Sequence, residues 1–113
     1  MSHYSRLCLA RDYLASRFNQ RTSLAEAAAQ AGLSPFYFHR LFAEAFSETP
    51  HEFVTRLRIE HAKKLLSRTA QKVESIAHDS GYQSINSFCV AFKRATGMSA
   101  KQFRDRMNRQ TAS

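Results

Sequence analysis

Glycine, proline and cysteine are scarce in this chain of 113 residues, which contains three, two and two of them. So few breakers of regular structure favour helices joined by short turns. Cys8 and Cys89 lack the paired spacing of a zinc site, so we expect a reduced, cytoplasmic protein. No charge-free stretch is long enough to span a bilayer, and no signal-peptide pattern opens the chain, so we expect no membrane contact.

Patterns that would indicate catalysis are also missing. The five histidines are scattered, and none belongs to a His-Glu-x-x-His or similar metal-binding spacing. The sequence has no glycine-rich loop that would cradle a phosphate. We therefore expect a protein that is not an enzyme and that binds neither a metal ion nor a cofactor.

Positive charge is abundant and unevenly distributed. The net charge is +8, yet residues 1–55 carry five basic and five acidic side chains, which cancel. Residues 56–113 carry twelve basic and four acidic side chains, so the whole excess lies there. An extended polyanion is the simplest partner for such a field, although the charge alone does not distinguish DNA from RNA or from a solubilising surface.

The chain repeats itself after about fifty residues, with residues 24–53 echoed by residues 73–103. Two pairs recur at an offset of 49, and five more recur at 50: Ala28/Ala77 and Gly32/Gly81, then Ser34/Ser84, Phe38/Phe88, Phe42/Phe92, Ala45/Ala95 and Phe53/Phe103. Each copy is a short apolar helix pattern, a turn containing glycine, and a longer helix with apolar residues four apart. That order is typical of a helix-turn-helix, whose second helix enters a DNA major groove.

Helical periodicity and capping signals predict an all-α fold of seven helices, near residues 4–18, 23–32, 35–46, 50–67, 73–80, 85–96 and 99–107. The starts carry capping-box pairs, such as Ser23 with Glu26 and Ser99 with Gln102. We predict a first helix-turn-helix subdomain over residues 1–49, a linker helix over 50–68 and a second subdomain over 69–113. The polar tail from residue 108 is expected to lie outside the last helix.

The apolar residues of each recognition helix are expected to face the core, so the remaining side chains of the helix face outward. We expect Phe38, Leu41, Phe42 and Ala45 to point inward, with Phe88, Ala91, Phe92 and Ala95 as their counterparts. The candidates for reading bases are then Phe36, Tyr37, His39, Arg40, Asn86, Ser87 and Val90. Arg40 can bond to guanine and Asn86 to adenine, and Phe36 can pack on a thymine methyl group. Phe36 can instead be a core residue, and Arg40 can be solvated or paired with an acid.

The second copy carries the pattern I-A-x-x-x-G-Y-x-S-x-x-x-F-x-x-x-F-K-R-x-x-G from Ile76 to Gly97, which resembles the signature of AraC/XylS-type bacterial transcription regulators. The first copy, from Ala27 to Pro50, is similar to that family's first helix-turn-helix. The resemblance implies two three-helix subdomains joined by the fourth helix, with the third and sixth helices in adjacent major grooves. It also implies control of transcription, more often activation, through contact with RNA polymerase.

The resemblance places the base-reading positions on six residues: Phe36, His39, Arg40, Asn86, Ser87 and Val90. At the last of these positions members commonly carry Arg, and Ser47 and Ala100 replace the usual Gly and Pro. We therefore expect the first copy to dominate base reading. The candidates for phosphate contacts are Ser34, Ser84, Lys93 and Arg94.

Other interpretations remain open at this stage. A helical adaptor that docks on RNA polymerase or another regulator would also suit a small basic protein, but it would present a continuous apolar stripe. Members of the family usually carry a sensing or dimerising domain, so the chain is either a small stand-alone regulator or part of a longer protein. Because two different copies lie in one chain, we expect a monomer that binds an asymmetric site on double-stranded DNA.

Overall fold

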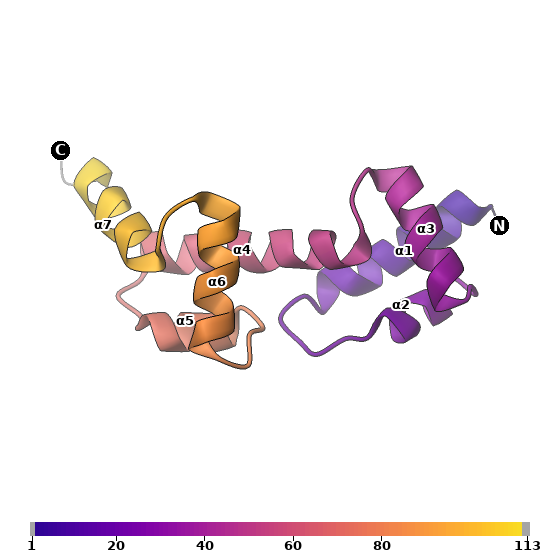
Figure 1. The fold of residues 1–113 in the computed structure, drawn as a ribbon, viewed down its shortest axis with the longest axis horizontal. Coiled ribbons are helices and arrows are strands. Elements are labelled where there is room, and N and C mark those ends of the chain that lie inside the picture. Colours follow the sequence, from indigo (N-terminus) through magenta and orange to yellow (C-terminus); the bar gives the residue numbers. More distant parts are fainter. Residues whose placement is uncertain (1, 112–113) are drawn as a thin grey trace. The chain divides into compact units, whose positions relative to one another are not determined.

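Seven α-helices and no strand make up residues 2–111, the part of the chain that the computed structural model describes (Figure 1). In chain order they are α1 (His3–Ser16), α2 (Leu24–Gln30), α3 (Pro35–Phe46), α4 (Pro50–Arg68), α5 (Val73–Asp79), α6 (Ile85–Thr96) and α7 (Ala100–Thr111). The all-α prediction is therefore confirmed. The helices form two compact units that divide within α4, with unit 1 ending at Leu57 and unit 2 beginning at Arg58.

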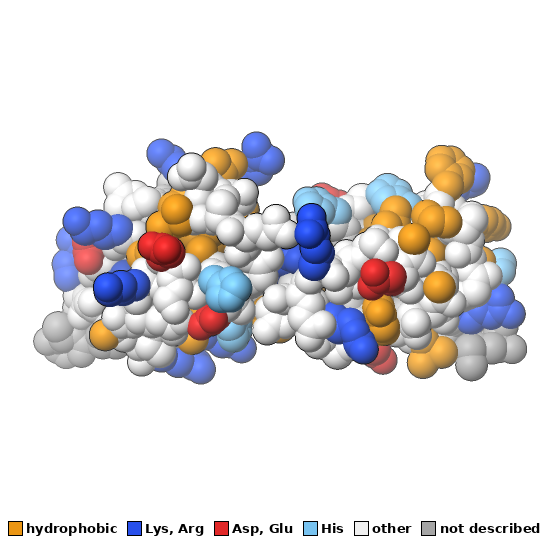
Figure 2. All heavy atoms as spheres, turned by 90° about the horizontal axis from the view of Figure 1, so that it is seen from below, with side chains coloured by type: hydrophobic (Ala, Val, Ile, Leu, Met, Phe, Trp, Pro, Cys, Tyr) orange, Lys and Arg blue, Asp and Glu red, His pale blue; other side chains and the backbone are white. Residues whose placement is uncertain are grey.

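The surface of both units is chemically mixed. Figure 2 shows one face, on which Lys and Arg side chains occur together with His and exposed hydrophobic side chains. The exposed large hydrophobic residues are few and scattered through the sequence: Tyr4, Leu9, Leu24, Phe36, Tyr37, Ile85 and Val90. Within residues 2–111, no helix has the length and the apolar character needed to cross a membrane.

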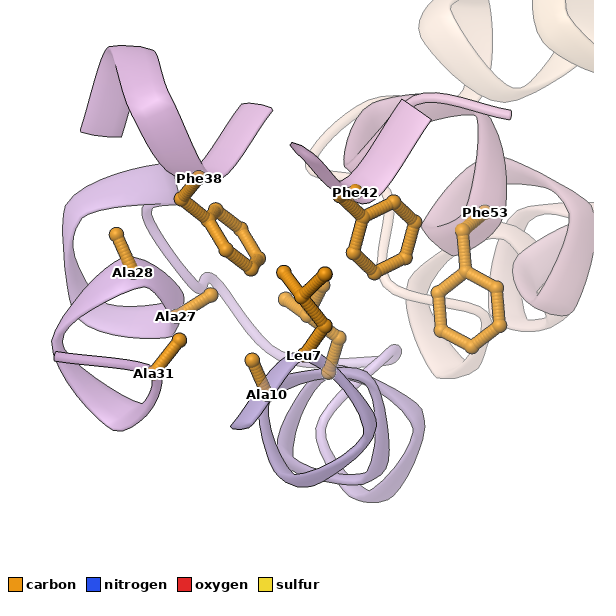
Figure 3. Packing of buried hydrophobic residues seen from close by; sticks show 9 residues of the cluster. Leu7, Ala10, Ala27, Ala28, Ala31, Phe38, Phe42 and Phe53 are labelled. Carbon is orange, nitrogen blue, oxygen red and sulfur yellow. The ribbon is translucent and has the colours of Figure 1, made fainter. Parts of the chain in front are cut away.

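Unit 1 packs α1, α2, α3 and the start of α4 around one hydrophobic core. Leu7 and Leu14 of α1 meet the two fully buried rings of α3, Phe38 and Phe42, and α4 adds Phe53 (Figure 3). The Phe38 and Phe42 rings lie edge to face with centroids 5.6 Å apart, an arrangement that aromatic pairs prefer. Short alanines of α2 and of its C-cap let the helices approach: Ala27, Ala28 and Ala31.

Unit 2 repeats this packing with equivalent residues. Phe88 and Phe92 of α6 are fully buried and their centroids are 5.5 Å apart. Phe103 of α7 lies 5.5 Å from the Phe92 centroid, as Phe53 lies 5.9 Å from that of Phe42. The second half of α4 supplies Ile59 and Leu66, and α5 supplies Ile76. The sequence repeat thus encodes a repeated aromatic core.

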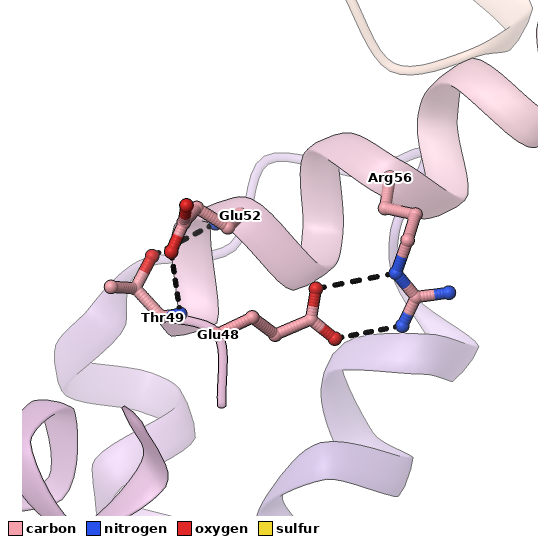
Figure 4. A network of polar contacts seen from close by, with 4 residues as sticks. All are labelled: Glu48, Thr49, Glu52 and Arg56. Carbon is pink, nitrogen blue, oxygen red and sulfur yellow. Dashed lines mark hydrogen bonds and ion pairs between the residues drawn. The ribbon is translucent and has the colours of Figure 1, made fainter. Parts of the chain in front are cut away.

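Capping bonds fix where several helices begin. The Thr49 hydroxyl accepts a bond from the Glu52 N–H at 3.1 Å, and the Glu52 carboxylate accepts from the Thr49 N–H at 2.9 Å (Figure 4). Ser99 and Gln102 exchange the same two bonds at the start of α7. Both capping boxes satisfy amides that the helix itself leaves unpaired. At α2 the box is half-formed, since the Glu26 N–H donates to Ser23 but no return bond is made.

Three sequence expectations are corrected by the structure. Ala45 and Ala95 are exposed, not inward-facing, because each lies in the last turn of its helix, beyond the layer of packed rings. Helix α1 ends at Ser16, so Phe18 is half-buried on the loop after it. Helix α7 runs to Thr111, well into the tail expected to be irregular, because residues 98–111 contain neither Gly nor Pro to stop it.

Candidate nucleic-acid interface

The same turn precedes α3 and α6. Gly32 and Gly81 adopt φ values of +67° and +99°, in the left-handed region that glycine enters without steric cost. The residue after each glycine donates its N–H back to the preceding helix: Leu33 to the Ala28 carbonyl at 3.1 Å, and Tyr82 to the Ala77 carbonyl at 3.0 Å. Both side chains are half-buried against their own core, as expected of residues that fill the angle between two helices.

Serine caps begin both recognition helices. The Ser34 hydroxyl accepts a bond from the Tyr37 N–H at 3.3 Å, and the Ser84 hydroxyl accepts from the Ser87 N–H at 3.1 Å. Pro35 occupies the first turn of α3, where its missing N–H costs nothing. A serine that caps as an acceptor keeps its own hydrogen to donate, so contact of Ser34 with a phosphate stays a prediction. Ser84 already donates to the Ser87 hydroxyl at 2.9 Å.

The outward face of α3 carries the four residues predicted for it, all of them exposed: Phe36, Tyr37, His39 and Arg40. The Phe36 side chain is 80% exposed, so its interpretation as a core residue is wrong. Tyr37 is 41% exposed, and its ring lies edge to face with that of His3 at 6.1 Å. His3 thus steadies one side of this face, a contact between distant segments that the repeat pattern did not signal.

Arg40 is paired in the free protein, since its Nε donates to the Glu44 carboxylate at 3.3 Å. The side chains of this pair are 70% and 60% exposed. An exposed pair one helical turn apart contributes about 0.3–0.5 kcal/mol, so it costs little to exchange. Arg40 can therefore leave Glu44 for a stronger, bidentate acceptor such as a guanine edge.

The outward face of α6 is less aromatic and more basic. Asn86, Ser87 and Val90 are exposed, as predicted, and they line a shallow, open hollow of about 450 Å³ together with Ala91 and Arg94. Lys93 and Arg94 are exposed, and neither has an ion-pair partner within residues 2–111. This face therefore offers two uncompensated positive charges beside its polar groups.

Cys89 is exposed on this same helix. Its side chain faces outward because the neighbouring Phe88, which is fully buried, takes the inward position. The thiol is accessible, but within residues 2–111 no three His, Cys, Asp or Glu side chains gather to hold a metal ion.

Some basic side chains have structural partners instead of open surroundings. Arg104 donates to the carbonyl oxygens of Leu66 and Thr69, at 3.1 and 3.2 Å, and so caps the end of α4. Arg56 forms a two-bond ion pair with Glu48, at 3.2 and 2.8 Å (Figure 4). Sequence reasoning did not distinguish these residues from basic residues that face solvent, because their partners depend on the folded chain.

The N-terminus of α4 follows α3 after a short turn and carries the Glu52 carboxylate. Hydrogen bonds from the Thr49 N–H and hydroxyl hold the pKa of the Glu52 carboxyl below its usual range, and the neighbouring His51 and His39 lower it further. His39 therefore lies within electrostatic reach of Glu52 while its own side chain is exposed.

Comparison with known proteins finds a match to the family profile described as "Helix-turn-helix domain" over residues 27–106. Probable transcriptional regulator LumQ of Photobacterium leiognathi is 32% identical over 92 residues, which are 81% of this chain and 37% of that protein. The C-terminal domain of AraT, a response regulator from Geobacillus stearothermophilus, is 31% identical with a TM-score of 0.83, over 88% of this chain and 83% of that one.

A third similar protein shares the fold. The DNA-binding domain of AdpA, whose crystal structure contains a target DNA, superposes with a TM-score of 0.87 at 21% identity, over 93% of this chain and 95% of that one. The chain spans between 12% and 37% of the length of the curated relatives it matches. With its two equivalent helix-turn-helix units and these matches, the chain belongs to the AraC-type family of helix-turn-helix domains, the DNA-binding domains of transcription regulators.

Proposed function

We propose that this domain binds double-stranded DNA sequence-specifically, with α3 (residues 35–46) and α6 (residues 85–96) in two adjacent major grooves. The observation that carries the proposal is the equivalence of the two units. In both, a glycine turn, a serine cap and a buried pair of phenylalanines leave the first two turns of the second helix facing outward. Those turns are the part of a recognition helix that contacts base edges.

One chain suffices for two grooves. Helix α4 has 19 residues, which span about 28 Å at 1.5 Å per residue, and it contributes to both units. Successive major-groove faces recur about 34 Å apart, so α4 with its flanking turns is a suitable spacer. The proposed complex is a monomer on an asymmetric site, because the two recognition helices carry different side chains.

The domain controls transcription and is not an enzyme, as its family indicates. We propose activation through contact with RNA polymerase, in the cytoplasm, where DNA and polymerase are found. Transcription in a reconstituted reaction tests this part. A promoter carrying the selected site should be transcribed more strongly when the protein is present, and unchanged or weaker transcription would contradict activation.

An adaptor that binds only protein is a weaker alternative. Its docking helix would show a continuous apolar stripe, whereas α3 and α6 present Phe36, His39, Arg40, Asn86 and Ser87. The mixture of apolar, cationic and amide groups matches what base edges offer in a major groove.

Selection of bound duplexes from a random library of about 30 base pairs, at near-physiological salt, tests the DNA proposal. Two enriched blocks about one helical turn apart, in an asymmetric arrangement, are the expected result. Binding without an enriched motif would contradict specific reading, and no retention at all would favour the adaptor.

Variants assign the blocks to the helices. Arg40→Ala should erase preference in one block, and Asn86→Ala should erase it in the other. A bidentate contact to a base is worth about 1–3 kcal/mol of discrimination. We expect the larger loss from Arg40→Ala, because α3 also presents His39 to the groove whereas Val90 of α6 has no hydrogen-bonding side chain. If Arg40→Ala leaves specificity intact while Asn86→Ala abolishes it, the second unit is the dominant reader.

A further inference from the structure

The outward faces of the two recognition helices are organised in rows of side chains four residues apart. Such residues lie one above another on a helix. The two rows consist of exposed residues on the side away from the buried phenylalanines, and they are Phe36, Arg40 and Glu44 in α3, and Asn86, Val90 and Arg94 in α6. Each position in one row corresponds to a position in the other at an offset of 50.

The chemistry of the two rows runs in opposite order. In α3 the apolar Phe36 comes first and the cationic Arg40 follows one turn later. In α6 the polar Asn86 comes first and the apolar Val90 follows one turn later. Each helix therefore presents one apolar group and one group able to make bidentate hydrogen bonds, with their places exchanged.

Phe36 and Val90 are the two most exposed large hydrophobic side chains within residues 2–111, at 80% and 60%. Neither contributes to its core, whose inward positions are filled by other residues of the same helices. Scattered apolar residues on a surface need no explanation, but these two occupy corresponding rows on the faces that meet DNA. In a major groove the apolar feature of the base edges is the C5-methyl group of thymine.

We propose that each recognition helix reads one thymine through its C5-methyl group, α3 with Phe36 and α6 with Val90. This inference rests on the proposed function, because it assumes that both helices enter the groove. It adds an ordering of each half-site. In the block read by α3, the thymine lies under the first turn of the helix and the base read by Arg40 lies farther along. In the block read by α6, the base read by Asn86 lies under the first turn and the thymine lies farther along.

Replacement of single thymines by deoxyuridine tests the proposal, since it removes the methyl group and leaves every hydrogen-bonding group in place. The probe is the duplex selected above, with one thymine at a time exchanged, and the dissociation constant is measured by fluorescence anisotropy. At one thymine in each block, the exchange should weaken binding about fourfold, the factor expected for one buried methyl group. At the remaining thymines the exchange should have no effect.

Truncated side chains connect each thymine to its reader. In the block read by α3, the Phe36→Ala variant should bind the thymine duplex and the uracil duplex with equal affinity. In the block read by α6, it should still lose affinity when thymine is exchanged for uracil. Val90→Ala should show the reverse pattern. Both residues are exposed, so the folds of their units should be unchanged, and circular dichroism checks this. Leu9→Ala is the matched control: it removes an apolar side chain that is 50% exposed on α1 and should change neither effect.

Each contrary result overturns the inference in a recognisable way. An enriched motif in which no thymine depends on its methyl group overturns this inference and leaves the proposed function intact. A methyl effect that persists in both alanine variants assigns it to other side chains and overturns the roles of Phe36 and Val90. Equal loss of affinity by Phe36→Ala for thymine and uracil duplexes indicates contact with a sugar or a base stack. Binding without any enriched motif overturns both this inference and specific reading.

Discussion

The two residues that end the recognition helices differ in a way that predicts opposite changes in stability. The C-cap residue that follows α3 is Ser47, with φ of +60°, and the C-cap residue that follows α6 is Gly97, with φ of +81°. Both lie in the left-handed region, and both N–H groups donate to the carbonyl four residues earlier. For a residue with a Cβ atom, the left-handed conformation costs about 1–2 kcal/mol in steric repulsion. Glycine has no such repulsion, but its greater loss of conformational entropy on folding costs about 0.5–1 kcal/mol more. The difference leaves a net advantage for glycine of about 0.5–1 kcal/mol.

Ser47→Gly should therefore stabilise unit 1 by about 0.5–1 kcal/mol, and Gly97→Ser should destabilise unit 2 by a similar amount. The exchange at Gly97 isolates the effect of the backbone conformation, because within residues 2–111 no heavy atom beyond its two chain neighbours lies within 4 Å of an added Cβ. Urea unfolding followed by circular dichroism at 222 nm measures both, and one kcal/mol corresponds to roughly 4–8 °C in melting temperature for a unit of this size. If both variants change stability in the same direction, left-handed strain is not what separates the two helix ends.

Three further predictions concern one buried hydroxyl, one carboxylate and the charges of α6. Ser80→Ala should stabilise unit 2 by about 1 kcal/mol in urea unfolding, because the buried Ser80 hydroxyl has no hydrogen-bond partner within residues 2–111. The corresponding residue of unit 1 is Ala31, so an alanine fits this position of the repeat. The pKa of Glu52 is lower in the folded than in the unfolded protein, so its stabilisation is complete above the unfolded-state pKa and declines as the pH falls through the folded-state pKa. Glu52→Gln should remove that part of the pH dependence, as followed by urea unfolding between about pH 6 and 3. The single variants Lys93→Ala and Arg94→Ala should each make the plot of the logarithm of the DNA association constant against the logarithm of the salt concentration less steep, by about 0.9, if the residue neutralises a phosphate. Lys93→Arg and Arg94→Lys should preserve the slope.

The sequence predicted helices and their starts well because the signals for both are local. A capping box needs only a side chain and an amide three residues apart, and the predicted box formed completely at Ser99 and by half at Ser23. The inward positions of Phe38 and Phe88 followed from a helical period applied in the middle of each helix. The same periodicity wrongly predicted that Ala45 and Ala95 point inward. Both residues lie in the last turn of their helices, where the hydrophobic core no longer extends under that side of the helix.

Contacts between distant segments could not be predicted in this way. Arg104 bonds to carbonyl groups 38 and 35 residues away, and nothing in its local sequence marks it as different from other basic residues of α7. The contact between His3 and Tyr37 likewise joins two helices. Of the candidate interface, the sequence identified the exposed side chains of α3 and α6, since exposure follows from periodicity. It did not identify which charges were already paired, such as Arg40 with Glu44, because pairing depends on side-chain geometry.

The charged side chains of α3 and α6 predict that the affinity of the two units for DNA depends differently on salt. On α3 the charge of Arg40 is balanced by Glu44, whereas on α6 Lys93 and Arg94 add without an acidic partner in the described residues. Affinity that comes from phosphate neutralisation falls steeply as salt rises, whereas apolar contacts and hydrogen bonds to bases are much less affected. Selection repeated at high salt should therefore weaken the block read by α6 and retain the block read by α3, where Phe36 and Arg40 face the bases. If instead the α6 block survives at high salt and the α3 block is lost, Asn86 and Val90 contribute more specific binding than the two residues of α3.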